Sequence, residues 1–307
     1  MNNNDRGKWI AVESTSVAAA EVARQALEVR TGYVMRLLPL AAHEFQKDVE
    51  YVHQLRVGSR RAAAAWQAFR PLMQGKPKAL RRWLRRIRRA AGPARDADVL
   101  LARLKKEYEH LPGLEYVLVR LDQQRLSAQQ ALVEVEAKSQ SGKLNRALQR
   151  CLDSLHGHHP GREDMPFQQF ARTALLVASQ ELFELTGLDQ ATVAQLHKLR
   201  IAGKRLRYSI ELFHAAFPAN LRREVYPQVE KLQNQLGRLN DHVTAQALFQ
   251  TWLASMPTDD RAATLARLIA EEHDAARHQR KKFLQWWTSR RAASVESQLR
   301  AQFGTVG

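Results

Sequence analysis

Residues 196–213 carry the pattern that decides the fold, and they read LHKLRIAGKRLRYSIELF. Apolar or small side chains recur in steps of three and four, which is the spacing of one face of an α-helix. These positions are Leu196, Leu199, Gly203, Leu206, Ile210 and Phe213. Each residue of a helix advances by about 100° around its axis. On this basis a strip of basic residues borders the apolar face, and it holds His197, Arg200, Lys204 and Arg207. We expect side chains in such a strip to project into a cleft between packed helices.

The same pattern occurs earlier in the chain, at residues 52–69, which read VHQLRVGSRRAAAAWQAF. The matching pairs are His53 with His197, Arg56 with Arg200, Arg60 with Lys204, and Arg61 with Arg205. One pattern, His-x-x-Arg-x-x-x-(Arg/Lys)-Arg, is therefore present twice, 144 residues apart, each time beside an apolar stripe. Two copies on two predicted helices indicate an internal duplication.

The composition of the chain predicts an all-α fold. Among 307 residues there are only 14 Gly and 10 Pro, and the common residues Ala, Leu, Arg, Gln and Glu favour helices. Clean runs of alternating β-branched residues are absent from the sequence. A hydrophobic content of 45% is enough for a sizeable core.

Two copies of this pattern in a basic, helix-forming chain resemble the CHAD domain, a histidine-containing α-helical domain, over about residues 17–290. The resemblance implies two pseudo-symmetric helical bundles around a central basic channel that binds inorganic polyphosphate. It also implies phosphate contacts at the matching positions: His53, Arg56, Arg60, Arg61, His197, Arg200, Lys204 and Arg205. Arg61 and Arg205 lie about 100° further round their helices than their neighbours.

The order of predicted helices and breaks suggests four segments. These are a flexible tail at 1–15, a first bundle at 16–155, a linker loop at 156–166 and a second bundle at 167–307. Breaks or kinks are expected near Gly32 and Pro39. A turn is expected at Ala91–Asp98, where Asp96 would cap the next helix, and Gly237–His242 echoes that turn.

The most basic segment, residues 78–91, contains six arginines and no acid. Arg82, Arg85 and Arg89 share one helical face. Like charges at this spacing repel and destabilise a helix, so an external anion that neutralises them is expected. A solvated arginine face is the alternative. The helical-face argument adds Arg82, Arg85, Arg89 and Arg207 to the predicted phosphate contacts.

The two halves differ in charge at the positions that correspond to this segment. Where the first half has Arg85, Arg86 and Arg89, the second has Glu230, Lys231 and Asn234. The anion-binding charge is therefore unevenly shared. We expect the first half to bind the anion more strongly.

The net charge of +17 points to a polyanionic partner, which includes nucleic acid, polyphosphate and anionic lipid. The single cysteine, Cys151, fits a reducing compartment. The polar N-terminus shows no signal peptide, and no stretch approaches the ~20 apolar residues that span a bilayer. We therefore expect a cytoplasmic protein with no membrane partner, and the resemblance adds polyphosphate granules as its site.

The sequence predicts a binding protein rather than an enzyme, with no cofactor and no metal. No phosphate-binding loop of the type G-x-x-x-x-G-K-[ST] is present. Capping of helices explains the carboxylate pairs Asp96/Asp98 and Asp259/Asp260. Three histidines at 156–159 fall in a predicted loop without a second ligand cluster. His53 and His197 are interpreted as anion ligands, with a core histidine, a general acid and a phosphoryl acceptor as the other readings.

Nucleic acid is the rival ligand, because the charge suits it. No zinc finger, RNA-recognition signature or basic-zipper pattern is found. Trp66 and Trp83 fall on apolar faces and not among the basic strips. Because the strips border buried faces, a narrow channel is expected to admit a thin chain such as polyphosphate and to exclude a duplex. A third possibility is an accessory role to a polyphosphate-metabolising enzyme.

Overall fold

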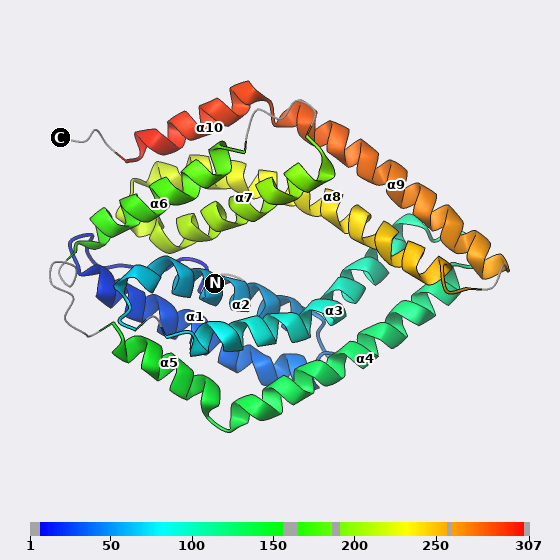
Figure 1. The fold of residues 1–307 in the computed structure, drawn as a ribbon, viewed down its shortest axis with the longest axis horizontal. Helices are drawn as coiled ribbons and strands as arrows, with labels where there is room; N and C mark the ends of the chain where they lie inside the picture. Colours follow the sequence, from blue (N-terminus) through cyan, green and yellow to red (C-terminus); the bar gives the residue numbers. More distant parts are fainter. Residues whose placement is uncertain (1–6, 76, 156–164, 186–190, 257–258, 304–307) are drawn as a thin grey trace. The chain divides into compact units, whose positions relative to one another are not determined.

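The computed structural model describes residues 7–75, 77–155, 165–185, 191–256 and 259–303. Ten α-helices fall within these residues (Figure 1). They are α1 Ala19–His43, α2 Glu50–Phe69, α3 Ala79–Glu107, α4 Leu114–Gln140, α5 Lys143–Asp153, α6 Phe167–Phe183, α7 Val193–Phe213, α8 Tyr226–Leu253, α9 Asp260–Trp286 and α10 Ser289–Ala301. Within the described ranges there is no β-strand, only one isolated bridge between Ala18 and Pro166. The prediction of an all-α fold is therefore confirmed.

Both helices that carry the repeated pattern are present. Helix α2 and helix α7 each end in a short 3₁₀ turn, at Arg70–Leu72 and His214–Ala216. A turn separates α4 from α5, and Gly142 adopts the left-handed conformation there (φ 71°), which glycine reaches without steric cost. The predicted cap of the helix at 260 is confirmed, because the Asp259 side chain accepts hydrogen bonds from the N–H groups of Arg261 and Ala262.

Two predicted turns, at 91–98 and 237–242, are wrong, and the breaks predicted near Gly32 and Pro39 are absent, because the helices continue through all four positions. Helix α1 is not broken at Gly32 or Pro39, and helix α8 runs through the segment 237–242. Helix α3 likewise continues through the predicted turn at 91–98, with Pro93 inside it. A proline removes one backbone donor and disfavours a helix interior. Here the apolar stripe continues across it, with Ile87, Ala94 and Leu104 buried, and this burial offsets the cost.

Residue contacts divide the chain into two compact units, each assembled from separate segments. Unit 1 comprises Met1–Asp96, Arg125–Ala178 and Tyr208–Arg222. Unit 2 comprises Ala97–Gln124, Ser179–Arg207 and Arg223–Gly307. Helices α3, α4, α6 and α7 contribute residues to both. The units are defined by packing and not by sequence repeats, so the predicted segment boundaries stay predictions. Most of the predicted linker lies outside the described residues.

The core of unit 1 is built on the packing of α1 against α2 (Figure 1). At Gly58 of α2, a Cβ atom would lie 3.1 Å from the ring of Tyr33, so glycine permits this close approach. An aromatic group completes the core, with stacked or edge contacts at 5.5–6.0 Å between ring centroids. Its members are Phe69, Phe167, Phe170 and Phe213. Buried aromatic area of this kind is a major source of core stability.

A buried ion pair fixes the orientation of α2 in unit 1. Arg61 donates from Nε to Oε2 of Glu211 at 2.9 Å, and Glu211 is fully buried. Arg30 lies beside them and donates to the backbone oxygens of Gly7, Lys8 and Arg61 at 3.0–3.1 Å. Burial lowers the pKa of Arg30 to about 10, against the opposing effect of the Glu211 charge. Residues 7 and 8, which fall in the predicted tail, are thus held by Arg30.

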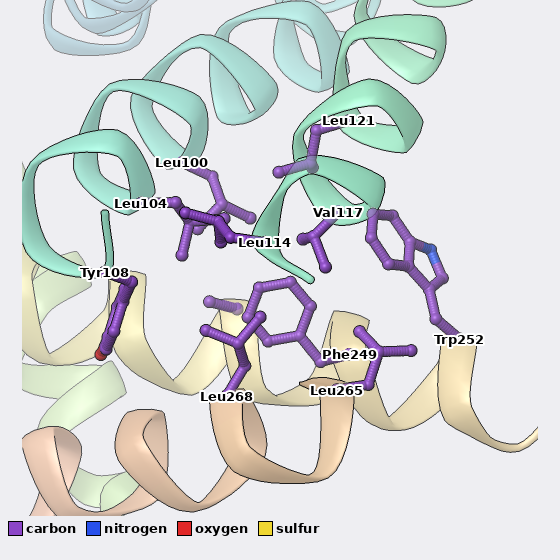
Figure 2. Packing of buried hydrophobic residues seen from close by; sticks show 11 residues of the cluster. Leu100, Leu104, Tyr108, Leu114, Val117, Leu121, Phe249, Trp252, Leu265 and Leu268 are labelled. Carbon is purple, nitrogen blue, oxygen red and sulfur yellow. The ribbon is translucent and has the colours of Figure 1, made fainter. Parts of the chain in front are cut away.

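The core of unit 2 joins the end of α3 and the start of α4 to α8 and α9 (Figure 2). Phe249 lies among the leucines and is fully buried, and Trp252 closes one side of the cluster. Trp252 also carries the Arg120 guanidinium at 4.4 Å from its ring centroid. Apolar burial of this kind stabilises by roughly 25 cal/mol per Å².

No helix in the described ranges is both long enough and apolar enough to span a bilayer.

A second buried ionic group links three helices of unit 2. Glu272 of α9 is fully buried and accepts hydrogen bonds from Arg103 of α3, at 2.7 and 3.0 Å. Nδ1 of His242 on α8 lies 2.7 Å from the same carboxylate and 3.0 Å from Nη1 of Arg103. Burial lowers the pKa of Arg103, but the hydrogen bonds and charge of Glu272 outweigh it, so this pKa is raised overall.

We expect Glu272→Gln to destabilise the protein by about 3 kcal/mol, because it removes the buried carboxylate that pairs with Arg103 and leaves this half-buried cation only the exposed Glu107 at 3.4 Å. The control is Glu296→Gln, which removes a surface pair with Arg300 one helical turn away and should change stability by about 0.5 kcal/mol or less. Urea unfolding followed by circular dichroism measures both. Equal losses for the two variants would show that the Arg103–Glu272 pair does not anchor the three helices.

Candidate functional site

In unit 1, the basic strip of α2 faces the first half of α3. Arg56 of α2 donates from Nη1 to the backbone oxygen of Gly92 in α3, at 2.8 Å. The same nitrogen pairs with Oδ1 of Asp96 at 2.9 Å. Desolvation lowers the pKa of Arg56, and the charge of Asp96 opposes this shift. These contacts fix the spacing of the two helices where their basic residues meet.

Four arginines gather where α2 meets α3. Arg60 comes from α2, and Arg85, Arg88 and Arg89 come from α3. Partial desolvation lowers the pKa of Arg88, and the positive charges of the other three lower it further, while the Tyr208 phenol has the opposite effect. Within the described part of the chain, none of the four forms an ion pair with a carboxylate. Unscreened like charges repel, so the group is set up to receive an anion.

His53 lies at the edge of this arginine group, on the same strip as Arg56 and Arg60. Its imidazole is partly buried. Desolvation lowers its pKa, and the nearby Arg95, Arg60 and Arg56 lower it further, whereas Glu50 raises it. In the free protein the ring therefore stays neutral at pH values where an ordinary histidine is charged. A bound anion would oppose the arginine charges and favour the protonated ring, which donates two hydrogen bonds.

The remaining predicted contacts of the first copy are placed differently. Arg82 is exposed on α3, beside Arg81 and Arg86, which lie over the rings of Trp66 and Trp83 at 5.4 and 5.1 Å. Arg61 is only 7% exposed, and its Nε is bound to Glu211. A side chain with this partner serves the core of unit 1, so its placement gives the prediction of a phosphate contact no support.

The second copy of the pattern lies in unit 2 and has acidic neighbours. Its basic residues differ in exposure: His197 and Arg205 are exposed, whereas Arg200, Lys204 and Arg207 are half-buried. Arg205 pairs with Glu181 of α6. Arg207 lies 3.4 Å from the Tyr226 hydroxyl, which donates to Glu230 at 3.1 Å. The positive charge of this copy is therefore partly compensated within unit 2.

Three residues of the unit 1 site were not predicted as contacts: Arg88, Arg95 and Asp96. Arg88, Gly92 and Arg95 recur at the i, i+4 and i+7 spacing of one helical face. This signal was hidden, because the segment 91–98 was interpreted as a turn, which interrupts helical periodicity. The predicted pair Asp96/Asp98 was likewise explained as a cap, whereas Asp96 pairs with Arg56 in the middle of a helix.

Among the side chains that the structure describes, no metal site accompanies the arginines. Across the described ranges, no three His, Cys, Asp or Glu side chains come together in a way that would hold a metal ion. Cys151 is buried, and burial raises its thiol pKa to about 12, so it is a poor nucleophile. What the site offers is a set of guanidinium donors, which match phosphate oxygens in charge and geometry.

In the described residues, the fold and the site together define an all-α protein with a group of cations between two of its helices. The chain belongs to the CHAD domain family, whose model matches residues 36–250. Its fold is similar to the CHAD domain of the plant Ricinus communis, with 22% identity, 96% of each chain covered and a TM-score of 0.68. It is also similar to PptA from Streptomyces chartreusis, with 19% identity, 88% of this chain and 99% of that chain covered, and a TM-score of 0.63. No curated protein matches the sequence.

We expect the free protein to show a His53 pKa below 6.5, the ordinary value, because burial and three arginines disfavour the charged ring. Arg95→Gln removes one of those charges and should raise this pKa. Histidine signals followed by NMR over a pH titration measure the change. A His53 pKa that Arg95→Gln leaves unchanged would contradict the electrostatic account of the site.

Proposed function

We propose that this protein binds inorganic polyphosphate through the arginines and histidine of the CHAD fold, and that it does so as a binding protein without catalysis. The observation that carries the proposal is the group Arg60, Arg85, Arg88 and Arg89, which has no carboxylate partner in the described structure. Such a group is unfavourable alone and favourable around a phosphate chain. The resemblance of the sequence to polyphosphate-binding CHAD domains supports the same ligand.

Polyphosphate suits the site for chemical reasons. It carries about one negative charge per phosphate and no bases, so fixed guanidinium donors bind it through many charge-assisted hydrogen bonds. The proposed contacts are His53, Arg56, Arg60, Arg82, Arg85, Arg89, His197, Arg200, Lys204 and Arg207, joined by Arg88 and Arg95. Two pseudo-symmetric bundles around a central basic channel, at 16–155 and 167–307, form part of this proposal, as does a location in the cytoplasm at polyphosphate granules.

Single-stranded nucleic acid is the competing ligand, because it carries the same backbone charge. Binding without sequence preference usually needs aromatic rings on which bases stack. In unit 1, Trp66 is buried to 1% exposure and also has Arg81 over its ring, and the ring of Trp83 has Arg86 over it. These aromatic faces are therefore occupied by the protein itself, which favours polyphosphate.

We expect long-chain polyphosphate to bind tightly and to keep most of its affinity at higher salt, while DNA of equal charge loses its affinity. The reason is that preformed guanidinium contacts add to the salt-dependent charge attraction. Titration calorimetry with polyphosphate, single-stranded DNA and duplex DNA at two salt concentrations makes the comparison. Equal and equally salt-dependent binding of all three would refute a specific site. Release of orthophosphate above background with a divalent metal would refute the absence of catalysis.

Charge reversal should weaken polyphosphate binding more in unit 1 than in unit 2. We expect Arg85→Glu and Arg89→Glu each to reduce affinity about tenfold or more, since each loses a charge-assisted contact. Lys231→Glu is the matched control, because it changes the net charge equally at a lysine that lies 5.1 Å over the Trp286 ring. Calorimetric titration of the three variants with polyphosphate measures these affinities. Equal effects would disprove the asymmetry between the two copies.

A further inference from the structure

The unit 1 site contains a negative charge in contact with Arg56, which a site for polyanions would not require. Asp96 lies on α3, one turn beyond Gly92, and pairs with Arg56 at 2.9 Å. Its carboxylate is 62% exposed, whereas the Arg56 side chain is only 19% exposed. A second carboxylate near the strip is Glu50, which raises the pKa of His53. Asp96 is thus an exposed acid in direct contact with a largely buried cation.

The orientation of Arg56 does not depend on Asp96. The backbone oxygen of Gly92 accepts a hydrogen bond from the same Arg56 nitrogen, at 2.8 Å, and a helical backbone oxygen does not move away. A carboxylate oxygen at 2.9 Å occupies the place that an oxygen of a phosphate would take at this guanidinium. Because Asp96 is exposed, its carboxylate can turn into water at little cost, since surface ion pairs contribute little.

We propose that Asp96 is a built-in counter-anion of Arg56, which a bound polyanion displaces. This inference rests on the proposed function and identifies a residue that sets its affinity. In the free protein Asp96 compensates the Arg56 charge, which lies near Arg60 and Arg88. On binding, a phosphate replaces the carboxylate at Arg56, and Asp96 becomes hydrated. Because the exchange at Arg56 is the same for a short anion and for a long chain, Asp96 lowers the affinity for both.

The experiment compares Asp96→Asn with the wild type in calorimetric titrations of tripolyphosphate and of long-chain polyphosphate. Asparagine keeps the shape of the side chain and removes its charge. We expect affinity for each ligand to rise about fivefold, the effect of removing one competing surface ion pair. Asp153→Asn is the matched control, because it removes the same charge from an exposed position on α5 of unit 1 and should leave affinity unchanged.

A second comparison tests whether Asp96 acts through Arg56. In an Arg56→Gln background, the Asp96→Asn change should no longer raise affinity. A persisting gain in that background, or an equal gain in Asp153→Asn, would reduce the effect to net charge and overturn the inference. Weaker binding by Asp96→Asn would show that Asp96 positions Arg56, and unchanged binding would show that Asp96 is not displaced. Either result would overturn this inference and leave the proposed function standing. If the wild type binds neither phosphate ligand, the proposed function fails with it.

Discussion

The buried pair between Arg61 and Glu211 is the interaction on which the site in unit 1 depends. A carboxylate without solvent exposure needs a cation and hydrogen bonds, and Arg61 supplies both. Since Arg61 must face the core, the rotation of α2 about its own axis is set. Arg60, about 100° away, then faces α3, together with Arg56 one turn earlier. A core requirement of unit 1 thus decides which basic residues are presented to a ligand.

The apolar stripe of α3 holds the arginines together against their repulsion. Leu80, Leu84 and Ile87 are fully buried in unit 1, so the helix stays packed although residues 79–91 also carry six arginines. Repulsion among these charges lowers the stability of the free protein, and a bound polyanion would remove it. The energy stored in the free state is therefore available for binding. Asp96 offsets part of this repulsion at Arg56.

The two copies of one sequence pattern have different surroundings. In unit 1 the basic strip of α2 meets further arginines from α3, and the pKa values of His53, Arg56 and Arg88 are all lowered. In unit 2 the copy on α7 lies near the acidic side chains of Glu181 and Glu230. Equal patterns therefore need not have equal affinity, because the charge that a ligand meets comes from neighbouring helices as much as from the pattern itself.

Periodicity and composition were sufficient to predict the all-α fold, the two patterned helices and the buried stripes, because these depend on local spacing along one helix. The basic strip His53, Arg56 and Arg60 followed from the same spacing. The continuity of α3 through Pro93 could not be predicted from this spacing, because helix packing outweighed the local effect of a proline. For the same reason the roles of Arg88, Arg95 and Asp96 were missed. Arg61 was assigned to the ligand and not to Glu211, because its partner lies 150 residues away and only packing brings the two charges together.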